Sequence, residues 1–307
     1  MVELEPKVVE ANRLIASERK SDPFSDPRVS VVVNDARNAM RLTDKTYDAI
    51  VSQPSHPWTA GASHLYTREF MTLVDDRLTD DGVFLQWMNL GFVTEDLLRS
   101  LAATMLDVFP YVRAYQVDPK VVYFIASRSP IAPELGIARS GKPLQSDRVR
   151  FSRKGMASLE DVVAMLAWDT EGLRTIAGQE PIITDDDNLM AMGSAKAFQD
   201  DALSYSRIKE LLLEHGPLYN AGSVIHRELG DLIDFVYVGD RLSEMYAPEL
   251  VQALVDTLEA RGHPHALALT AKDLRRQNQK QRADVALLAA LERDPDDVPS
   301  SFLILQD

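Results

Sequence analysis

The chain has 307 residues, of which 45% are hydrophobic and 26% charged, which is typical of a globular protein and excludes a disordered or fibrous one. This length favours two domains, each able to bury its own core. A net charge of −14 disfavours nucleic acid as a partner, and the absence of cysteine excludes disulfides, thiolate metal sites and thiol catalysis.

Apolar runs in the sequence are far shorter than the ~20 residues that cross a bilayer, so we expect no membrane span in this chain. The first residues show no basic, apolar leader, and we therefore expect a cytoplasmic location. The one basic cluster, Lys272 to Arg282, is interrupted by Asp273 and several glutamines. We interpret it as a solvated helix face rather than a nucleic-acid site.

Short apolar runs alternate with helical patterns through the first 130 residues. The predicted strands cover the first few residues, 29–33, 48–52, a stretch from Val83, 111–117 and 121–127. The predicted helices lie between them, the clearest at 67–78 and 94–109. The last two strands are close enough to form an antiparallel pair. This alternation predicts an α/β fold with a doubly wound, mostly parallel sheet.

The second half of the sequence has a different pattern. Proline, glycine and serine mark residues 131–147 as a linker or excursion, 158–177 is predicted to be helical, and 181–192 a short extended segment with three acids. Five helices are predicted after Leu203, at 203–214, 221–237, 247–261, 264–277 and 280–292. They suggest a tetratricopeptide-like array, although no clean repeat of about 34 residues is present.

The stretch YDAIVSQPSHPW, residues 47–58, is the strongest candidate for a site. Its apolar run ends in a loop because two prolines forbid both helix and further strand pairing. Ligands of open α/β sheets bind beyond the carboxyl ends of the strands. Gln53, Ser55 and His56 are therefore the candidate functional residues.

Five segments then carry a resemblance to a known family: ELEPKVVEAN, DPRVSVVVNDAR, YDAIVSQPSHPWTAGASHLYTREF, LTDDGVFLQW and ITDD. In this order they resemble the spermidine synthase-like (polyamine aminopropyltransferase) family, and most the branch associated with membrane transporter-like segments. The resemblance implies a methyltransferase-type Rossmann fold. It also implies decarboxylated S-adenosylmethionine as co-substrate, an aminopropyl transfer to putrescine, and no permanently bound cofactor.

The resemblance also assigns roles by position. Glu3 resembles the acid that binds the ribose hydroxyls, and Asp35 resembles the acid beside the adenine. Gln53 and His56 stand where active members have two aspartates, one of which takes a proton from the attacking amine. Ser55, Trp58 and Asp185 are expected to lie on the substrate side.

Two departures from the family pattern concern the chemistry. Gln53 cannot accept a proton, and loss of a general base typically costs about 10²- to 10⁴-fold in rate. In addition, the family's first strand and glycine-rich loop should precede Glu3, and the sequence is expected to be N-terminally truncated relative to the family. Three alternatives follow: the natural protein extends upstream, another chain supplies the strand, or the flanking strands pair directly.

Each candidate residue also has a purely structural interpretation. Asp35 could simply cap a helix, and Glu3 could fray. His56 could be an ordinary polar loop residue, and Trp58 and Trp87 could belong to the core. The three acids 185–187 could form a solvated turn rather than a metal site; no metal is expected.

The sequence thus predicts a partial spermidine synthase-like Rossmann domain at 1–135, an excursion with the TDD segment at 136–200 and a helical domain at 201–307. Two functions fit this organisation. The first is an adenosyl-nucleoside-binding transferase relative, with a polyamine as a possible second ligand and with altered or lost aminopropyl transfer. The second is a non-catalytic interaction module whose C-terminal helices bind a protein partner.

Overall fold

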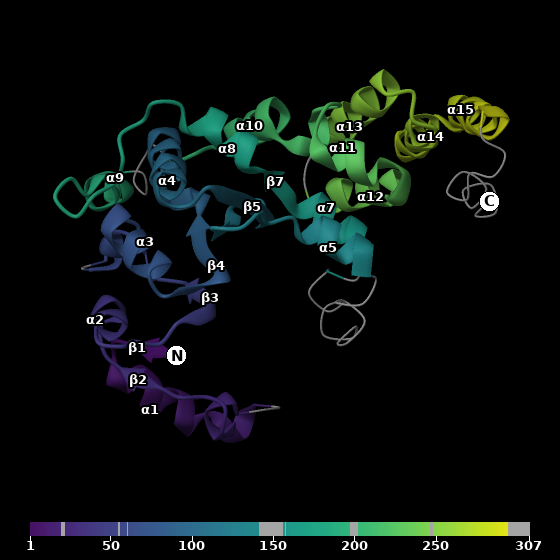
Figure 1. Ribbon diagram of the computed structural model, residues 1–307. Coiled ribbons are helices and arrows are strands. Elements are labelled where there is room, and N and C mark those ends of the chain that lie inside the picture. Colours follow the sequence, from purple (N-terminus) through teal and green to yellow (C-terminus); the bar gives the residue numbers. More distant parts are fainter. Residues whose placement is uncertain are drawn as a thin grey trace.

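The architecture was analysed in a computed structural model of the chain (Figure 1). It describes residues 1–307 apart from 20–21, 55, 60, 141–155, 157, 197–201, 246–247 and 294–307. Its strands form two sheets, and helices make up most of the second half.

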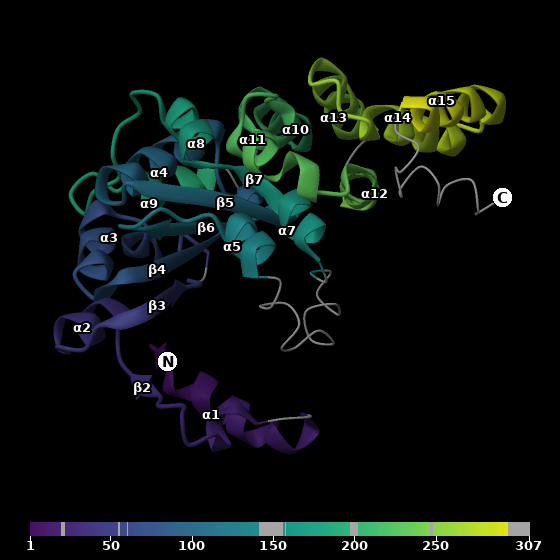
Figure 2. The ribbon, with the colours of Figure 1, turned by 45° about the vertical axis from the view of Figure 1, so that its right-hand side comes forward.

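The smaller sheet belongs to the first 46 residues, here called the N-terminal unit. Its strands β1 (Val2–Glu3) and β2 (Val32–Val33) pair in parallel, with Val2 opposite Val32. Helix α1 (Pro6–Leu14) follows β1, and α2 (Ala36–Arg41) follows β2. In Figures 1 and 2 this unit lies beside the β3 side of the main sheet, with α1 on its far side.

The main sheet has five strands in the order β3-β4-β6-β5-β7. They are β3 (Tyr47–Ser52), β4 (Leu78–Asn89), β5 (Tyr111–Asp118), β6 (Val121–Ser127) and β7 (Leu166–Trp168). β3 and β4 are parallel, whereas the pairs β4–β6, β5–β6 and β5–β7 are antiparallel.

The α/β fold and the antiparallel pair β5–β6 are as predicted, but the expectation of a mostly parallel main sheet is wrong. The chain reverses by a short connection between β5 and β6, so β6 runs antiparallel both to β5 and to its other neighbour, β4. Among the described strands of this sheet, β3 and β4 are the parallel neighbours, and the helix α3 (Arg68–Asp75) joins them in a crossover.

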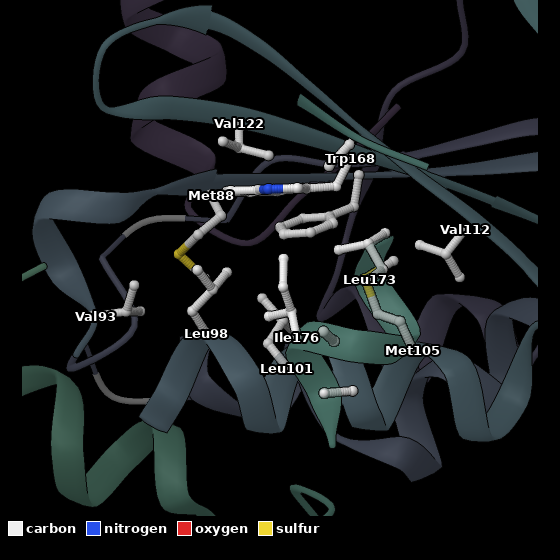
Figure 3. Packing of buried hydrophobic residues seen from close by; sticks show 14 of the residues in the cluster. Met88, Val93, Leu98, Leu101, Met105, Val112, Val122, Trp168, Leu173 and Ile176 are labelled. Carbon is white, nitrogen blue, oxygen red and sulfur yellow. The ribbon is translucent and has the colours of Figure 1, made fainter. Parts of the chain in front are cut away.

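Helices α3 and α4 (Glu95–Val108) begin at threonine caps. The Thr67 side chain accepts a hydrogen bond from Phe70 N–H, and the Thr94 side chain from Leu97 N–H. Together with α8 (Thr170–Ala177) they pack on the sheet and bury its apolar face. Figure 3 shows this core: Leu98, Leu101 and Met105 of α4 and Ile176 of α8 lie under Trp168 of β7.

Two stretches differ from the sequence prediction. Residues 158–177 are not one helix but α7 (Leu159–Met165), β7 and α8, because the buried Leu166–Trp168 pairs with β5. The predicted linker 131–147 contains helix α5 (Pro133–Ser140), and its remaining part from 141 lies outside the described residues. In the segment 181–192, the extended part ends where α9 (Leu189–Lys196) begins.

The C-terminal part is helical, as predicted. Its helices are α10 (Tyr205–His215), α11 (Val224–Leu229), α12 (Phe235–Met245), α13 (Pro248–Ala260), α14 (His265–Arg276) and α15 (Lys280–Arg293). The predicted helix 221–237 is therefore divided between α11 and α12. Figure 2 shows α13 to α15 extending away from the sheet. Within the described residues, no helix combines the length and apolarity that a membrane span requires.

Candidate functional site

The two candidate nucleoside-binding acids lie at the carboxyl ends of neighbouring parallel strands. Glu3 ends β1 opposite Val33, and Asp35 follows β2 by two residues. The Glu3 carboxylate accepts a hydrogen bond from Glu5 N–H at 3.0 Å, and Asp35 accepts one from Asn38 N–H at 2.9 Å. Asp35 is thus the N-cap of α2, which confirms the structural interpretation of this residue. The pairing of β1 with β2 brings the two acids together.

The loop after β3 carries the next group of candidates. Gln53 and His56 are exposed, Trp58 is half-buried, and Ser55 lies outside the described residues. The imidazole of His56 stacks on the Trp58 ring, with 4.8 Å between ring centroids and 15° between planes. This contact holds His56 in a defined orientation at the loop surface.

A second aromatic group reaches this loop from the end of β4. Ser52 pairs with Gln86, so the carboxyl ends of the parallel strands β3 and β4 are adjacent. Phe92 follows β4 and meets His56 and Trp58 edge-on, at 4.6 Å and 4.9 Å between centroids. Trp87 also contacts Phe92, at 6.4 Å. Both tryptophans are therefore part of an aromatic cluster beside the loop rather than of the main core.

Asp185, from the segment before α9, is the centre of a polar cluster. Its two carboxylate oxygens accept hydrogen bonds from the two terminal nitrogens of Arg37, at 2.7 and 2.6 Å. Thr67 donates a further hydrogen bond at 2.8 Å, and His64 Nδ1 lies 3.3 Å away. A bidentate contact of this kind combines charge with fixed geometry.

These contacts shift the titration of both partners. The hydrogen bonds from Arg37 hold the pKa of Asp185 well below its usual range, with smaller contributions from Thr67 and His64, against the opposing effect of partial burial. The same contact with Asp185 raises the pKa of Arg37. Asp185 therefore stays ionised at every physiological pH. A cationic substrate at Asp185 would have to compete with Arg37.

The Asp185 cluster also connects the two groups of candidate residues. Arg37 is the second residue of α2, two residues after Asp35, and its guanidinium also donates to the backbone carbonyl of His64 at 3.3 Å. His64 lies in the segment between the loop after β3 and helix α3. Arg37 therefore links α2, which follows β2, to the segment that follows β3.

Sequence reasoning missed three residues of this arrangement: Arg37, Thr67 and Phe92. The only sequence signal for Arg37 is its place in the first turn after the Asp35 cap, and a contact across 148 residues has no local signature. Within the described parts of the chain, no cluster of three or more histidine, aspartate or glutamate side chains is placed to hold a metal ion.

Comparison with known proteins finds similarity in the first part of the chain. Residues 1–121 match the Spermine/spermidine synthase domain. A polyamine aminopropyltransferase of Synechococcus sp. (strain JA-2-3B'a(2-13)) is 31% identical over 140 residues, which are 43% of this chain and 45% of the relative. The corresponding enzyme of Synechococcus sp. (strain JA-3-3Ab) is 38% identical over 119 residues, 38% of each chain.

Among solved structures, a probable spermidine synthase from Corynebacterium glutamicum is 20% identical, with a TM-score of 0.41, and the match covers 60% of this chain and 62% of that one. The chain spans less than half the length of the two Synechococcus relatives. Residues 1–121 are thus similar to the spermine/spermidine synthase domain and to polyamine aminopropyltransferases.

Proposed function

We propose that this chain is a spermidine synthase-like protein that binds an adenosyl nucleoside and in which aminopropyl transfer to a polyamine is altered or lost. The observation that carries the proposal is the loop after β3, where the residues at the positions of the family's acids are an exposed amide, Gln53, and an imidazole stacked on Trp58, His56.

Aminopropyl transfer requires a base because the attacking amine is protonated at neutral pH. An amide cannot take this proton, whereas a carboxylate within hydrogen-bond reach can. A pocket that has exchanged two carboxylates for Gln53 and His56 also offers less charge to a dicationic diamine. The nucleoside side retains both acids, Glu3 and Asp35, at adjacent strand ends. This asymmetry favours retained nucleoside binding over retained transfer.

We further propose that the family domain is only partly contained in residues 1–307. Strands β1 and β3 are neighbours in neither described sheet, so the alternative in which they pair directly is not supported. Each of these two strands exposes an apolar side chain: Val2 of β1 is 39% exposed and Val51 of β3 is 65% exposed. A further strand between β1 and β3 would satisfy both open edges and cover these side chains. We also propose that the protein belongs to the branch of the family that is associated with membrane transporter-like segments, and that residues 1–307 lie in the cytoplasm.

A second function is supported by the opposite end of the molecule. Helix α15 exposes Val285 by 69% and Leu288 by 59%, while its inner face packs through Leu287 on α14. Exposed apolar side chains on one helix face are a feature of protein–protein contacts. The alternative is therefore a non-catalytic interaction module that binds a protein partner through these helices, in a tetratricopeptide-like manner.

Calorimetric titration separates the two functions. The titrants are S-adenosylmethionine, its decarboxylated form and methylthioadenosine, and the protein is the full polypeptide that carries residues 1–307. Saturable binding of any of them at one site per chain supports the first function. A folded protein that binds none of the three contradicts it and favours the second.

A further inference from the structure

The N-terminal unit carries both candidate nucleoside-binding acids, yet its two strands pair only with each other among the described strands. Among the residues that the structure describes, the side chains of Arg37 and Arg77 make hydrogen bonds between this unit and the rest of the chain. Arg77, the residue before β4, donates to the Met40 carbonyl at 3.0 Å, and Arg37 makes the bidentate pair with Asp185. The orientation of the unit therefore depends on side-chain contacts at α2.

Asp185 is a fixed anchor for this contact because the segment before it is bound to the main sheet's helices. The buried Ile183 N–H donates to the Thr104 hydroxyl of α4 at 2.9 Å, and Arg68 N–H of α3 donates to the Ile183 carbonyl at 2.8 Å. Asp185 N–H donates to the Glu69 carboxylate of α3 at 2.9 Å. Three hydrogen bonds over three residues leave the Asp185 backbone little freedom.

We propose that Asp185 is a positioning residue: through Arg37 it docks α2, and with it Asp35, against the segment that follows the candidate catalytic loop. The side chain of Arg37 is only 12% exposed. Both terminal nitrogens of its guanidinium donate to Asp185, and one of them also donates to the His64 carbonyl. The contact therefore fixes direction as well as distance. Loss of the pair frees α2 to move relative to Gln53 and His56.

This inference rests on the proposed function only for its consequence in ligand binding. The docking itself can be measured without a ligand, by hydrogen exchange with mass spectrometry on peptides that cover α2. In Asp185→Asn, one oxygen becomes an amide that cannot accept from the fork, and we expect α2 amides to exchange about tenfold faster or more. Asp186→Asn removes the same charge from an exposed neighbour and is expected to leave this exchange unchanged.

A double variant tests whether the effect passes through Arg37. If the pair acts as one unit, Arg37→Gln with Asp185→Asn exchanges no faster in α2 than Asp185→Asn alone, because each change has already removed the same contact. Additive increases would overturn the proposal, as would an Asp185→Asn protein whose α2 exchange equals that of Asp186→Asn.

The ligand measurement keeps the two proposals apart. With methylthioadenosine as the probe, Asp185→Asn should raise the dissociation constant about tenfold relative to Asp186→Asn. If the unchanged protein binds no nucleoside, the proposed function fails, and the exchange result still decides the role of Asp185. If the nucleoside binds equally well to both variants while α2 is freed, Asp185 has no positioning role in the site.

Discussion

Replacement of Thr104 by valine tests how the segment that carries Asp185 is held in place. Thr104 is fully buried on α4, where its hydroxyl donates to the Ser100 carbonyl at 2.6 Å and accepts from Ile183 N–H at 2.9 Å. Ile183 is also fully buried. Valine preserves the shape of the side chain but offers no acceptor, so the Ile183 N–H loses its hydrogen bond inside the protein.

The size of the effect follows from the two hydrogen bonds. The Ser100 carbonyl keeps its helical partner when the hydroxyl is removed, and this loss is small. A buried N–H without an acceptor costs about 1 to 3 kcal/mol. We therefore expect Thr104→Val to lower the free energy of unfolding by about 1 to 3 kcal/mol.

Thr257→Val is the matched control. Thr257 is also buried in a helix, and its hydroxyl donates to the Ala253 carbonyl four residues earlier, the same geometry as the contact between Thr104 and Ser100. Because no backbone N–H depends on it, its loss should cost under about 1 kcal/mol. Urea unfolding is followed by tryptophan fluorescence and far-ultraviolet circular dichroism. A Thr104→Val loss no greater than that of the control would refute the reasoning.

Three further predictions concern packing, protonation and catalysis. A Cβ at Gly172 would lie 2.4 Å from a backbone carbonyl of α10, so Gly172→Ala should lower the thermal midpoint although alanine favours helices; an unchanged or higher midpoint contradicts this. Burial lowers the pKa of His226 and His263 below the usual 6.5. These two side chains therefore bind protons more readily in the unfolded chain than in the folded protein, and the stability that they contribute in the neutral form is lost as the pH falls below 6.5. Circular dichroism at 222 nm should show a thermal midpoint lower at pH 5 than at pH 7, with a smaller difference in His226→Gln. In the full polypeptide, Gln53→Asp with His56→Asp should raise aminopropyl transfer, measured as methylthioadenosine release; unchanged null activity counts against the role assigned to this loop.

The sequence predicted those parts of the fold that have local causes. The antiparallel pair β5–β6 follows from two apolar runs with a short connection, and α4 follows from the Thr94 cap and its apolar periodicity. The cap at Asp35 was recognised for the same reason. Each of these features is determined by residues that are close together in the sequence, and can therefore be predicted from it.

The parts that were missed depend on distant residues. Leu166–Trp168 has no strand signal of its own, and its extended form depends on pairing with β5, some 50 residues earlier by the register of Ala114 with Trp168. Likewise, three acids in a row at 185–187 look alike in the sequence. Because Arg37 and Thr67 lie close to Asp185, this first acid is partly buried in an ion pair, whereas Asp186 is exposed. The domain boundaries at 135 and 200 stay predictions.

The most direct test of the account is the affinity for methylthioadenosine of the full polypeptide with and without Asp35→Asn. Asparagine caps helices as well as aspartate does, so α2 should remain intact while the charged acceptor for the nucleoside is lost. The account predicts saturable binding by the unchanged protein and about tenfold weaker binding or worse by the variant, with no change for Asp44→Asn, an exposed control. Equal affinity of all three proteins, or no binding by the unchanged one, would contradict it.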